Sequence, residues 1–389
     1  MSSFVAYLSC ARWGRALDHR VPQGLCPCGG PLLADYDLDA VASAVSKADL
    51  PARVPTMWRY RELLPVEDAG SVVSLGEGFT PLLPMPALGE RIGLPDLWVK
   101  DEGLNPTGTF KARGAACGVS RARELGIRHV ALPTAGNAGG AWACYGAAAG
   151  LDVHVAMPAA APSANRAECE LFGADVTLVD GLISEAGRVI DRQCREEGWF
   201  DVSTMKEPYR VEGKKTLGLE IAEQLGWMAP DAIIYPAGGG VGVIGIWLAM
   251  RQLRQMGWLE NDAPRLIITQ SAGCAPLIRA FEQGSEESEP WRDGQTIAHG
   301  LRVHKAFADF LVLRAVRETG GTALAVTDDD IRESIRSFGQ AGIGACPEGA
   351  ATLAAAEALR ERGDLSSRDR VVLINTGSAL KYPDALGAD

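Results

Sequence analysis

Short apolar segments alternate with longer segments of helical character from about residue 97 onward, and this alternation restricts the possible folds most strongly. The apolar segments 97–99, 129–132, 153–157, 233–235 and 371–374 are typical of β-strands. Repeated strand–helix units of this spacing indicate parallel sheets covered by helices, with right-handed crossovers. The sequence therefore predicts an α/β protein.

Four segments place small or polar residues at the point where a predicted strand is followed by a helix or loop. They span residues 105–114, 133–140, 236–242 and 375–381. In open α/β sheets, ligands bind at the carboxyl ends of the strands. We therefore expect these four segments to contain the residues that carry the chemistry.

The first segment contains Lys111, which lies in the first turn of a predicted helix. The N-terminus of a helix is the positive end of its dipole, so a charged lysine is poorly placed there. The position favours the neutral amine, which is the form that makes a Schiff base. Taken alone, this position is more often occupied by an ordinary solvated surface lysine than by a catalytic one.

The third segment is rich in glycine. It contains Gly238, Gly239, Gly240, Val241 and Gly242 directly after a buried strand. Glycine costs conformational entropy, but its backbone N–H groups can converge on a phosphate at a helix N-terminus. The alternative is a glycine turn without a ligand.

The other two segments offer polar side chains. Asn137 begins an alanine-rich helix, where it acts either as a helix cap or as an amide facing a ring oxygen of a cofactor. The segment 375–381 follows the strand 371–374 and offers a hydroxyl to a ring nitrogen, with an ordinary polar loop as the alternative.

Composition excludes several classes of protein. The chain of 389 residues predicts two to three domains. Its net charge of −11 argues against a nucleic-acid-binding protein. We see neither an uninterrupted membrane-spanning segment nor a secretory signal. The nine cysteines are mostly scattered singly, which favours reduced thiols and a cytoplasmic location.

The first 35 residues contain Cys10, Cys26 and Cys28 followed by Gly29-Gly30 and resemble half of a zinc knuckle. A structural zinc site usually has four ligands, often in two close pairs. Trp13 stands where a partner of Cys10 is expected, although His19 could serve as a fourth ligand. We expect no stoichiometric zinc and no other metal.

Together these segments resemble the second structural class of pyridoxal-phosphate enzymes, and most closely the threonine synthase family. Residues 74–82 (SLGEGFTPL) resemble the first motif of that family, and 105–114 resemble its lysine motif. Residues 134–137 are similar to its Ser-x-Gly-Asn motif, and 376–381 to its closing Thr-Gly-x-x-Leu-Lys. The likeness extends from about residue 70 to the C-terminus.

The resemblance implies a fold type II enzyme with two open parallel-sheet α/β domains and pyridoxal 5′-phosphate between them. The implied large cofactor domain comprises residues 36–117 and 207–389, and the small mobile domain comprises residues 118–206. Residues 1–35 would form a short degenerate head similar to a zinc ribbon.

The resemblance also implies a role for each motif residue. Lys111 would hold the cofactor covalently and later move protons, while Asn137 would bond the ring hydroxyl. Gly238–Gly242 would hold the cofactor phosphate, and Thr376 would face the pyridine nitrogen. Thr134, Ala135 and Arg210 would bind a small amino-acid substrate.

The implied activity is that of a lyase making threonine from O-phosphohomoserine, with no nucleic-acid or membrane partner and a homodimeric assembly. Some residues depart from the family pattern. Lys111 is followed by Ala112, as in threonine and serine ammonia-lyases. The substrate-phosphate segment, 204–210, keeps Arg210 but lacks several neutral donors, for which Lys206, Lys214 or Lys215 could compensate.

These departures leave alternatives open. The first is a threonine or serine ammonia-lyase or a β-replacement enzyme, which needs the same lysine but no second anion pocket. The second is a non-catalytic protein that binds pyridoxal phosphate or an amino acid.

Overall fold

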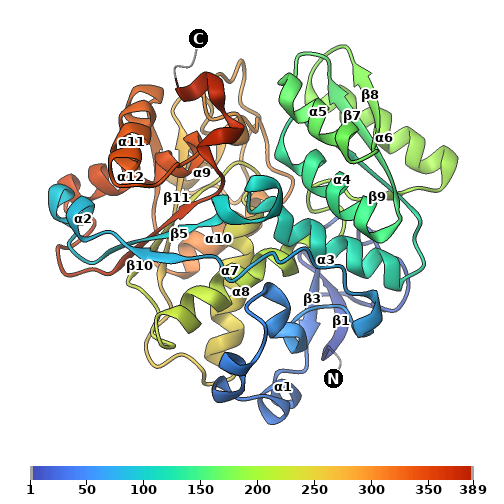
Figure 1. Ribbon diagram of the computed structural model, residues 1–389, viewed down its shortest axis with the longest axis horizontal. Helices are drawn as coiled ribbons and strands as arrows, with labels where there is room; N and C mark the ends of the chain where they lie inside the picture. Colours follow the sequence, from blue (N-terminus) through green and yellow to red (C-terminus); the bar gives the residue numbers. More distant parts are fainter. Residues whose placement is uncertain (1–2, 387–389) are drawn as a thin grey trace. The chain divides into compact units, whose positions relative to one another are not determined.

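The computed structural model describes residues 3–386, so the outermost residues of the predicted head and large domain (1–2 and 387–389) lie outside it. The chain divides into two compact units (Figure 1). The first unit comprises residues 1–79 and 111–216, and the second comprises residues 80–110 and 217–389. Helix α7 (Arg210–Gln224) contains the third crossing from one unit to the other.

The second unit is built on a six-stranded sheet in the order β12-β11-β10-β13-β5-β4. Every neighbouring pair is parallel except β4 and β5, which are antiparallel. The strands are β4 (Leu82–Pro84), β5 (Leu97–Asp101), β10 (Ala232–Pro236), β11 (Arg265–Ser271), β12 (Ala323–Val326) and β13 (Val371–Asn375). Because β10 and β13 are buried along their whole length, they have the continuous apolar sequence of inner parallel strands.

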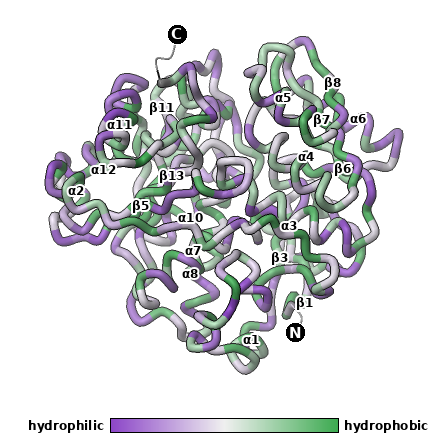
Figure 2. The backbone as a smooth tube through the Cα atoms, viewed as in Figure 1, coloured by the Kyte–Doolittle hydropathy of each residue, from purple (hydrophilic) through white to green (hydrophobic). Residues whose placement is uncertain are grey.

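The helices of this unit are α2 (Pro86–Ile92), α8 (Val241–Gln255), α9 (Pro276–Glu282), α10 (Asp309–Glu318), α11 (Asp328–Gln340) and α12 (Pro347–Arg362). Helix α12 is alanine-rich and buried through most of its length, and several of its residues share a core with β5, β10 and β13. Helix α11 buries only Ile331, Ser334 and Phe338, and its hydrophilic stretches are visible in Figure 2.

The first unit contains a four-stranded parallel sheet in the order β8-β7-β6-β9. Its strands are β6 (His129–Pro133), β7 (Asp152–Pro158), β8 (Asp175–Val179) and β9 (Phe200–Asp201). Its helices include α3 (Lys111–Glu124), α4 (Asn137–Ala149), α5 (Ser163–Leu171) and α6 (Ile183–Glu197). The predicted α/β class with parallel sheets is confirmed.

The N-terminal residues form an antiparallel sheet in the order β2-β1-β3, followed by the short helix α1 (Leu38–Ala44). Its strands are β1 (Val5–Cys10), β2 (Ala16–Leu17) and β3 (Leu32–Tyr36). Leu8 and Leu32 belong to the same apolar core as Ala116 of α3. The head is therefore packed into the first unit.

The compact units differ from the domain limits predicted from the sequence. Residues 36–79 and helix α3 belong with the four-stranded sheet, whereas the sequence assigned 36–117 to the cofactor domain. The physical reason is a shared core, because Ala112, Ala115 and Cys117 of α3 belong to the same apolar cluster as Trp142 of α4. The two helices approach closely, since a Cβ built on Gly118 would lie 2.5 Å from the Trp142 ring. No helix in the range 3–386 is long and apolar enough to cross a membrane.

The approach of α3 to α4 gives a prediction about stability. We expect Gly118→Ala to lower the free energy of unfolding by about 1–3 kcal/mol, because the added methyl group overpacks against Trp142. Gly187→Ala in α6 is the control, since nothing lies within 4 Å of its Cβ position. That variant should gain about 0.5–1 kcal/mol from helix propensity. Equal unfolding curves for the two variants would contradict the packing described here.

Candidate active site

Two of the sequence motifs are joined by backbone hydrogen bonds in the second unit. The Phe110 N–H donates to the Thr376 carbonyl at 3.0 Å, and the Ser378 N–H donates to the Gly108 carbonyl at 2.9 Å. Thr109 and Gly377 form an antiparallel bridge between these bonds. Phe110 is the residue before Lys111, so this junction (108–110 with 376–378) fixes the chain leading into Lys111 against the closing motif.

A third segment extends the junction on its other side. The Cys346 N–H donates to the Gly377 carbonyl at 3.0 Å, and the Ala379 N–H donates to the Gly344 carbonyl at 2.8 Å. The closing motif thus lies between two other segments of the chain. Its backbone has no freedom to move independently of the lysine motif.

The glycine segment after β10 forms a close-packed turn that leads into α8. A Cβ on Gly238 would lie 2.1 Å from the Gly300 carbonyl oxygen, and one on Gly242 would lie 2.1 Å from the Tyr235 hydroxyl. Gly240 has φ +72° and caps α8. Glycine is therefore required at these three positions by space or by backbone conformation. The turn presents backbone N–H groups at a helix N-terminus, as a phosphate site does.

Thr376 is 6% exposed, and its side chain contacts a buried thiol. Cys346 Sγ lies 3.4 Å from Thr376 Oγ1 and 3.6 Å from Asn375 Oδ1, and it accepts the Gly349 N–H at 3.2 Å. Burial raises the pKa of the Cys346 thiol well above its ordinary value, and the Glu348 carboxylate adds to this effect. The group behind Thr376 is therefore a neutral thiol.

Glu348 lies near the glycine turn and is almost fully buried. Its Oε1 accepts the Gly300 N–H at 2.6 Å, and Gly300 is the residue whose carbonyl abuts Gly238. Its Oε2 is buried and has no hydrogen-bond partner. A buried oxygen without a partner is costly, so this oxygen indicates a place where a bound group can complete the site.

Three of the five non-glycine residues with positive φ in the described part of the chain lie in the segments that resemble family motifs, while Trp227 and Asp293 lie outside them. Phe79 has φ +48°, Thr107 has φ +61° and Met205 has φ +62°. Thr107 is β-branched, for which positive φ is rare. Such strain tends to occur at functional sites, where surrounding contacts hold it in place. Lys111 follows Thr107 by four residues and begins α3, as predicted.

The Thr134–Asn137 loop of the first unit leads from β6 into α4. The Gly136 N–H donates to Thr134 Oγ1 at 3.1 Å, and the Asn165 amide donates to the Ala135 carbonyl at 3.0 Å. Gly136 caps α4, and Asn137 is its first residue. Asn137 is therefore not the helix cap that the sequence offered as an alternative.

Comparisons with known proteins agree with this arrangement. A family model described as pyridoxal-phosphate dependent enzyme matches residues 73–377. A threonine synthase from Methanocaldococcus jannaschii is 34% identical over 378 residues, covering 97% of this chain and 93% of its own length. A threonine synthase from Methanosarcina acetivorans is 35% identical over 361 residues, covering 92% and 88%. The chain belongs to the threonine synthase family of pyridoxal-phosphate enzymes. Its cofactor is pyridoxal 5′-phosphate, and it is a lyase.

Solved structures share the type II fold with this threonine synthase family member. Maize serine racemase has a TM-score of 0.68 at 23% identity, covering 77% of this chain and 88% of its own. Threonine deaminase isoform 2 from Solanum lycopersicum has a TM-score of 0.66 at 22% identity, covering 79% and 87%. At this level of identity the likeness shows the fold.

Arg210 has several protein partners. Its Nε donates to Glu207 Oε1 at 2.8 Å, its Nη1 donates to Thr204 Oγ1 at 3.2 Å, and its Nη2 donates to the Val202 carbonyl. Its guanidinium also lies over the Trp142 ring, 5.4 Å from the centroid. The Glu207 carboxylate balances its charge. Three of its five N–H donors are used in these bonds, and two remain.

Two lysines that the sequence offered as substitutes for missing phosphate donors are paired with carboxylates. Lys206 Nζ lies 3.0 Å from both Asp191 Oδ1 and Asp201 Oδ2. Burial acts to lower the pKa of Lys206, but these two carboxylates raise it above its ordinary value. Lys215 is fully buried and paired with Glu212. Neither lysine therefore offers an unbalanced positive charge.

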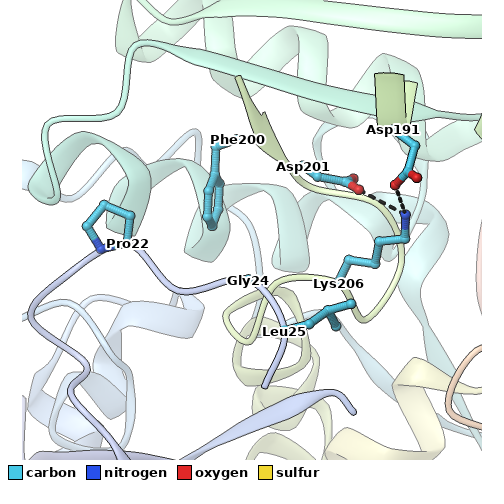
Figure 3. Close-up of a pocket in the computed structure, with 7 residues that line it drawn as sticks. All are labelled: Pro22, Gly24, Leu25, Asp191, Phe200, Asp201 and Lys206. Atoms are coloured by element: carbon cyan, nitrogen blue, oxygen red, sulfur yellow. Dashed lines mark hydrogen bonds and ion pairs between the residues drawn. The ribbon is translucent and has the colours of Figure 1, made fainter. Parts of the chain in front are cut away.

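A hollow of about 350 Å³ in the first unit surrounds Lys206 (Figure 3). It is lined by Pro22, Gly24, Leu25, Asp191, Phe200, Asp201 and Lys206. Figure 3 shows the lysine ammonium turned toward the two aspartates. Among the residues that the sequence connected with cofactor or substrate, only Lys206, offered as a substitute phosphate donor, lines this hollow.

Sequence reasoning missed three functional neighbours. The sequence analysis assigned no role to Cys346 or Glu348, although the thiol contacts Thr376 and the carboxylate contacts Gly300. Glu77, in the first motif, is fully buried and accepts bonds from Trp58 Nε1 and the Tyr145 hydroxyl, each at 2.7 Å. Glu77 is a charged residue between two glycines of the first motif, and this pattern could have indicated a buried side chain with a specific role.

The tight glycine turn gives a prediction about cofactor binding. We expect Gly238→Ala to weaken binding of pyridoxal phosphate by roughly ten- to a hundredfold, since the methyl group would displace the Gly300 backbone at a cost of about 1–3 kcal/mol. Gly339→Ala in α11 is the control, because nothing lies within 4 Å of its Cβ position. Absorbance titration of cofactor-free protein measures both. Equal affinities would show that the turn does not hold the cofactor.

Proposed function

We propose that this enzyme converts O-phosphohomoserine and water to threonine and inorganic phosphate. The observation that carries the proposal is the match to threonine synthases over 97% of this chain. Such a match includes the motif segments and the N-terminal head together. Structural likeness alone extends to racemases and deaminases, so it supports the cofactor chemistry more than the substrate.

The residues present fit pyridoxal phosphate. Gly238–Gly242 would hold its phosphate, Asn137 its ring hydroxyl and Thr376 its pyridine nitrogen, while Lys111 would bind it covalently. The fit rests on the close-packed turn, where a Cβ at Gly238 or Gly242 would meet neighbouring atoms at 2.1 Å. When bound, the cofactor supplies an electron sink for a carbanion at the substrate Cα.

In this proposal the protein moves protons and positions groups. The neutral Lys111 amine takes the proton from Cα. The Thr376 hydroxyl, rather than a carboxylate, would face the pyridine nitrogen and would leave it unprotonated. The Cys346 thiol donates to Asn375 Oδ1 at 3.6 Å and lies 3.4 Å from Thr376 Oγ1, so it holds the threonine side chain in place. The loop that contains Thr134 and Ala135 would bind the substrate carboxylate.

Elimination of ammonia from threonine or serine is the second candidate activity. The observation that favours it is the pairing of Arg210, Lys206 and Lys215 with carboxylates. This pairing leaves less positive charge for binding a substrate phosphate, which an ammonia-lyase does not need. The products separate the two activities. Inorganic phosphate with threonine supports the synthase, and ammonia with a 2-oxo acid supports the ammonia-lyase.

Lys111 provides the first test of the site. We expect Lys111→Ala to lose covalently attached cofactor and activity, because only an amine can form the bond at this position. Borohydride reduction of the parent enzyme followed by peptide mapping should place the label on Lys111. A label on another lysine would refute the assignment. The unfolding curve of Lys111→Ala shows whether this variant is still folded.

Arg210 tests the substrate. If its two remaining N–H donors hold a phosphate, Arg210→Ala should lower kcat/KM for O-phosphohomoserine by roughly 30- to several-thousand-fold, equivalent to about 2–5 kcal/mol, because the phosphate loses its charged partner. Turnover of threonine should change much less, because threonine has no phosphate. Thr204→Val serves as a control that removes a neutral partner of Arg210 and keeps its charge. Equal losses with both substrates would assign Arg210 a structural role.

We further propose a cytoplasmic homodimer. All nine cysteines are free thiols, which suits a reducing compartment. Light scattering of the purified enzyme measures the assembly.

A further inference from the structure

The geometry points to a binding site for one thiophilic metal ion in the head, formed by the thiolates of Cys10, Cys26 and Cys28 with an open fourth position. This site goes beyond the cofactor chemistry. The three sulfur atoms all lie within 4.8 Å of one another, and Cys10 Sγ is 3.5 Å from Cys28 Sγ. Zinc–sulfur bonds of about 2.3 Å in a tetrahedral site separate two sulfurs by about 3.8 Å. The cluster is therefore close to the spacing that an ion imposes.

The backbone around the cluster has two tight turns that direct N–H groups at sulfur. After Cys10, the backbone N–H groups of Arg12 and Trp13 donate to its Sγ. After Cys26, the Gly30 N–H lies 3.4 Å from Cys28 Sγ, and Gly29 has φ +80°. Donors of this kind stabilise and orient thiolate ligands. Two independent turns thus converge on the same cluster.

Core packing does not account for this arrangement. Cys10 and Cys26 are buried, but Cys28 is an exposed residue whose sulfur still faces the other two. Within residues 3–386, this is the only cluster of three or more metal-ligating side chains of this kind. A buried cysteine that only fills space needs no second or third thiol beside it.

The fourth position is open for identifiable reasons. His19 is not part of the cluster, and it contacts Arg121 instead: its ring Nδ1 lies 3.1 Å from Arg121 Nη2, and its carbonyl accepts from the same guanidinium. Trp13 occupies the position at which a second cysteine would complete a Cys-x-x-Cys pair with Cys10, so no fourth thiolate is available there. Water or another small ligand would complete a tetrahedral ion. The expectation of no zinc assumed four protein ligands, and a three-thiolate site removes that requirement.

The test uses the full-length, cofactor-loaded enzyme under reducing conditions. Metal is removed with a chelator, and Zn²⁺ or Co²⁺ alone is added back before desalting. We expect about one ion per chain by elemental analysis and a thiolate-to-cobalt absorption band. Cys28→Ser should lose the ion and the band. Cys144→Ser in α4 is the matched control and should keep both, since Cys144 lies outside the cluster.

A second variant covers the case in which Cys28→Ser fails to fold. Trp13→Cys supplies a fourth thiolate at the predicted spacing, so it should bind Co²⁺ more tightly than the parent enzyme in a chelator competition. Three results would overturn the proposal. They are no retained ion in the parent enzyme, equal retention by Cys28→Ser and Cys144→Ser, and a Cys10–Cys28 disulfide in the reduced preparation. An unchanged affinity in Trp13→Cys would also count against it.

Discussion

The backbone junction between residues 108–110 and 376–378 is the contact on which the candidate site depends. Two hydrogen bonds, Phe110 to Thr376 and Ser378 to Gly108, connect segments more than 260 residues apart along the chain. A shift of either segment would move Phe110, to which Lys111 is directly bonded. The segment 344–346 binds the other side of the closing motif, so Thr376 is fixed from both sides.

Buried charges stabilise the segments on either side of this junction. In the second unit, Lys100 Nζ is fully buried and lies 2.7 Å from Glu220 Oε2 and 2.6 Å from the Thr80 carbonyl. The Thr80 hydroxyl and the Asn105 amide both donate to Glu102. These bonds connect the first motif to the lysine motif. Removing one partner would leave a buried charge or acceptor unsatisfied, which costs several kcal/mol.

The first unit contains a similar buried network between the head and α7. The Tyr36 hydroxyl donates to Glu212 Oε2 at 2.7 Å, and Lys215 pairs with the same carboxylate. Burial raises the pKa of Glu212 and lowers that of Lys215, while their attraction opposes both shifts. This network explains why the head is part of the first unit, and why Lys215 is unavailable to a substrate phosphate.

The sequence by itself determined the features that depend on neighbouring residues. Alternating apolar segments predicted the parallel strands, and the motifs predicted that Lys111 and Asn137 begin helices and that a glycine turn precedes α8. Strand β12 and helices α9–α11 were not predicted, although α11 has a capping box at Thr327 and buries Ile331 and Phe338 along one face, which are sequence signals of a helix. The motifs also identified the family and its cofactor.

Only the tertiary structure decided which side chains meet across long stretches of chain. It placed Cys346 behind Thr376 and left Glu348 Oε2 without a partner. It paired Lys206 with two aspartates and brought the three head thiols together. These contacts join residues from separate elements, and local sequence preferences carry no information about such pairs. Burial then sets the charge of each group, and burial is a property of the folded chain.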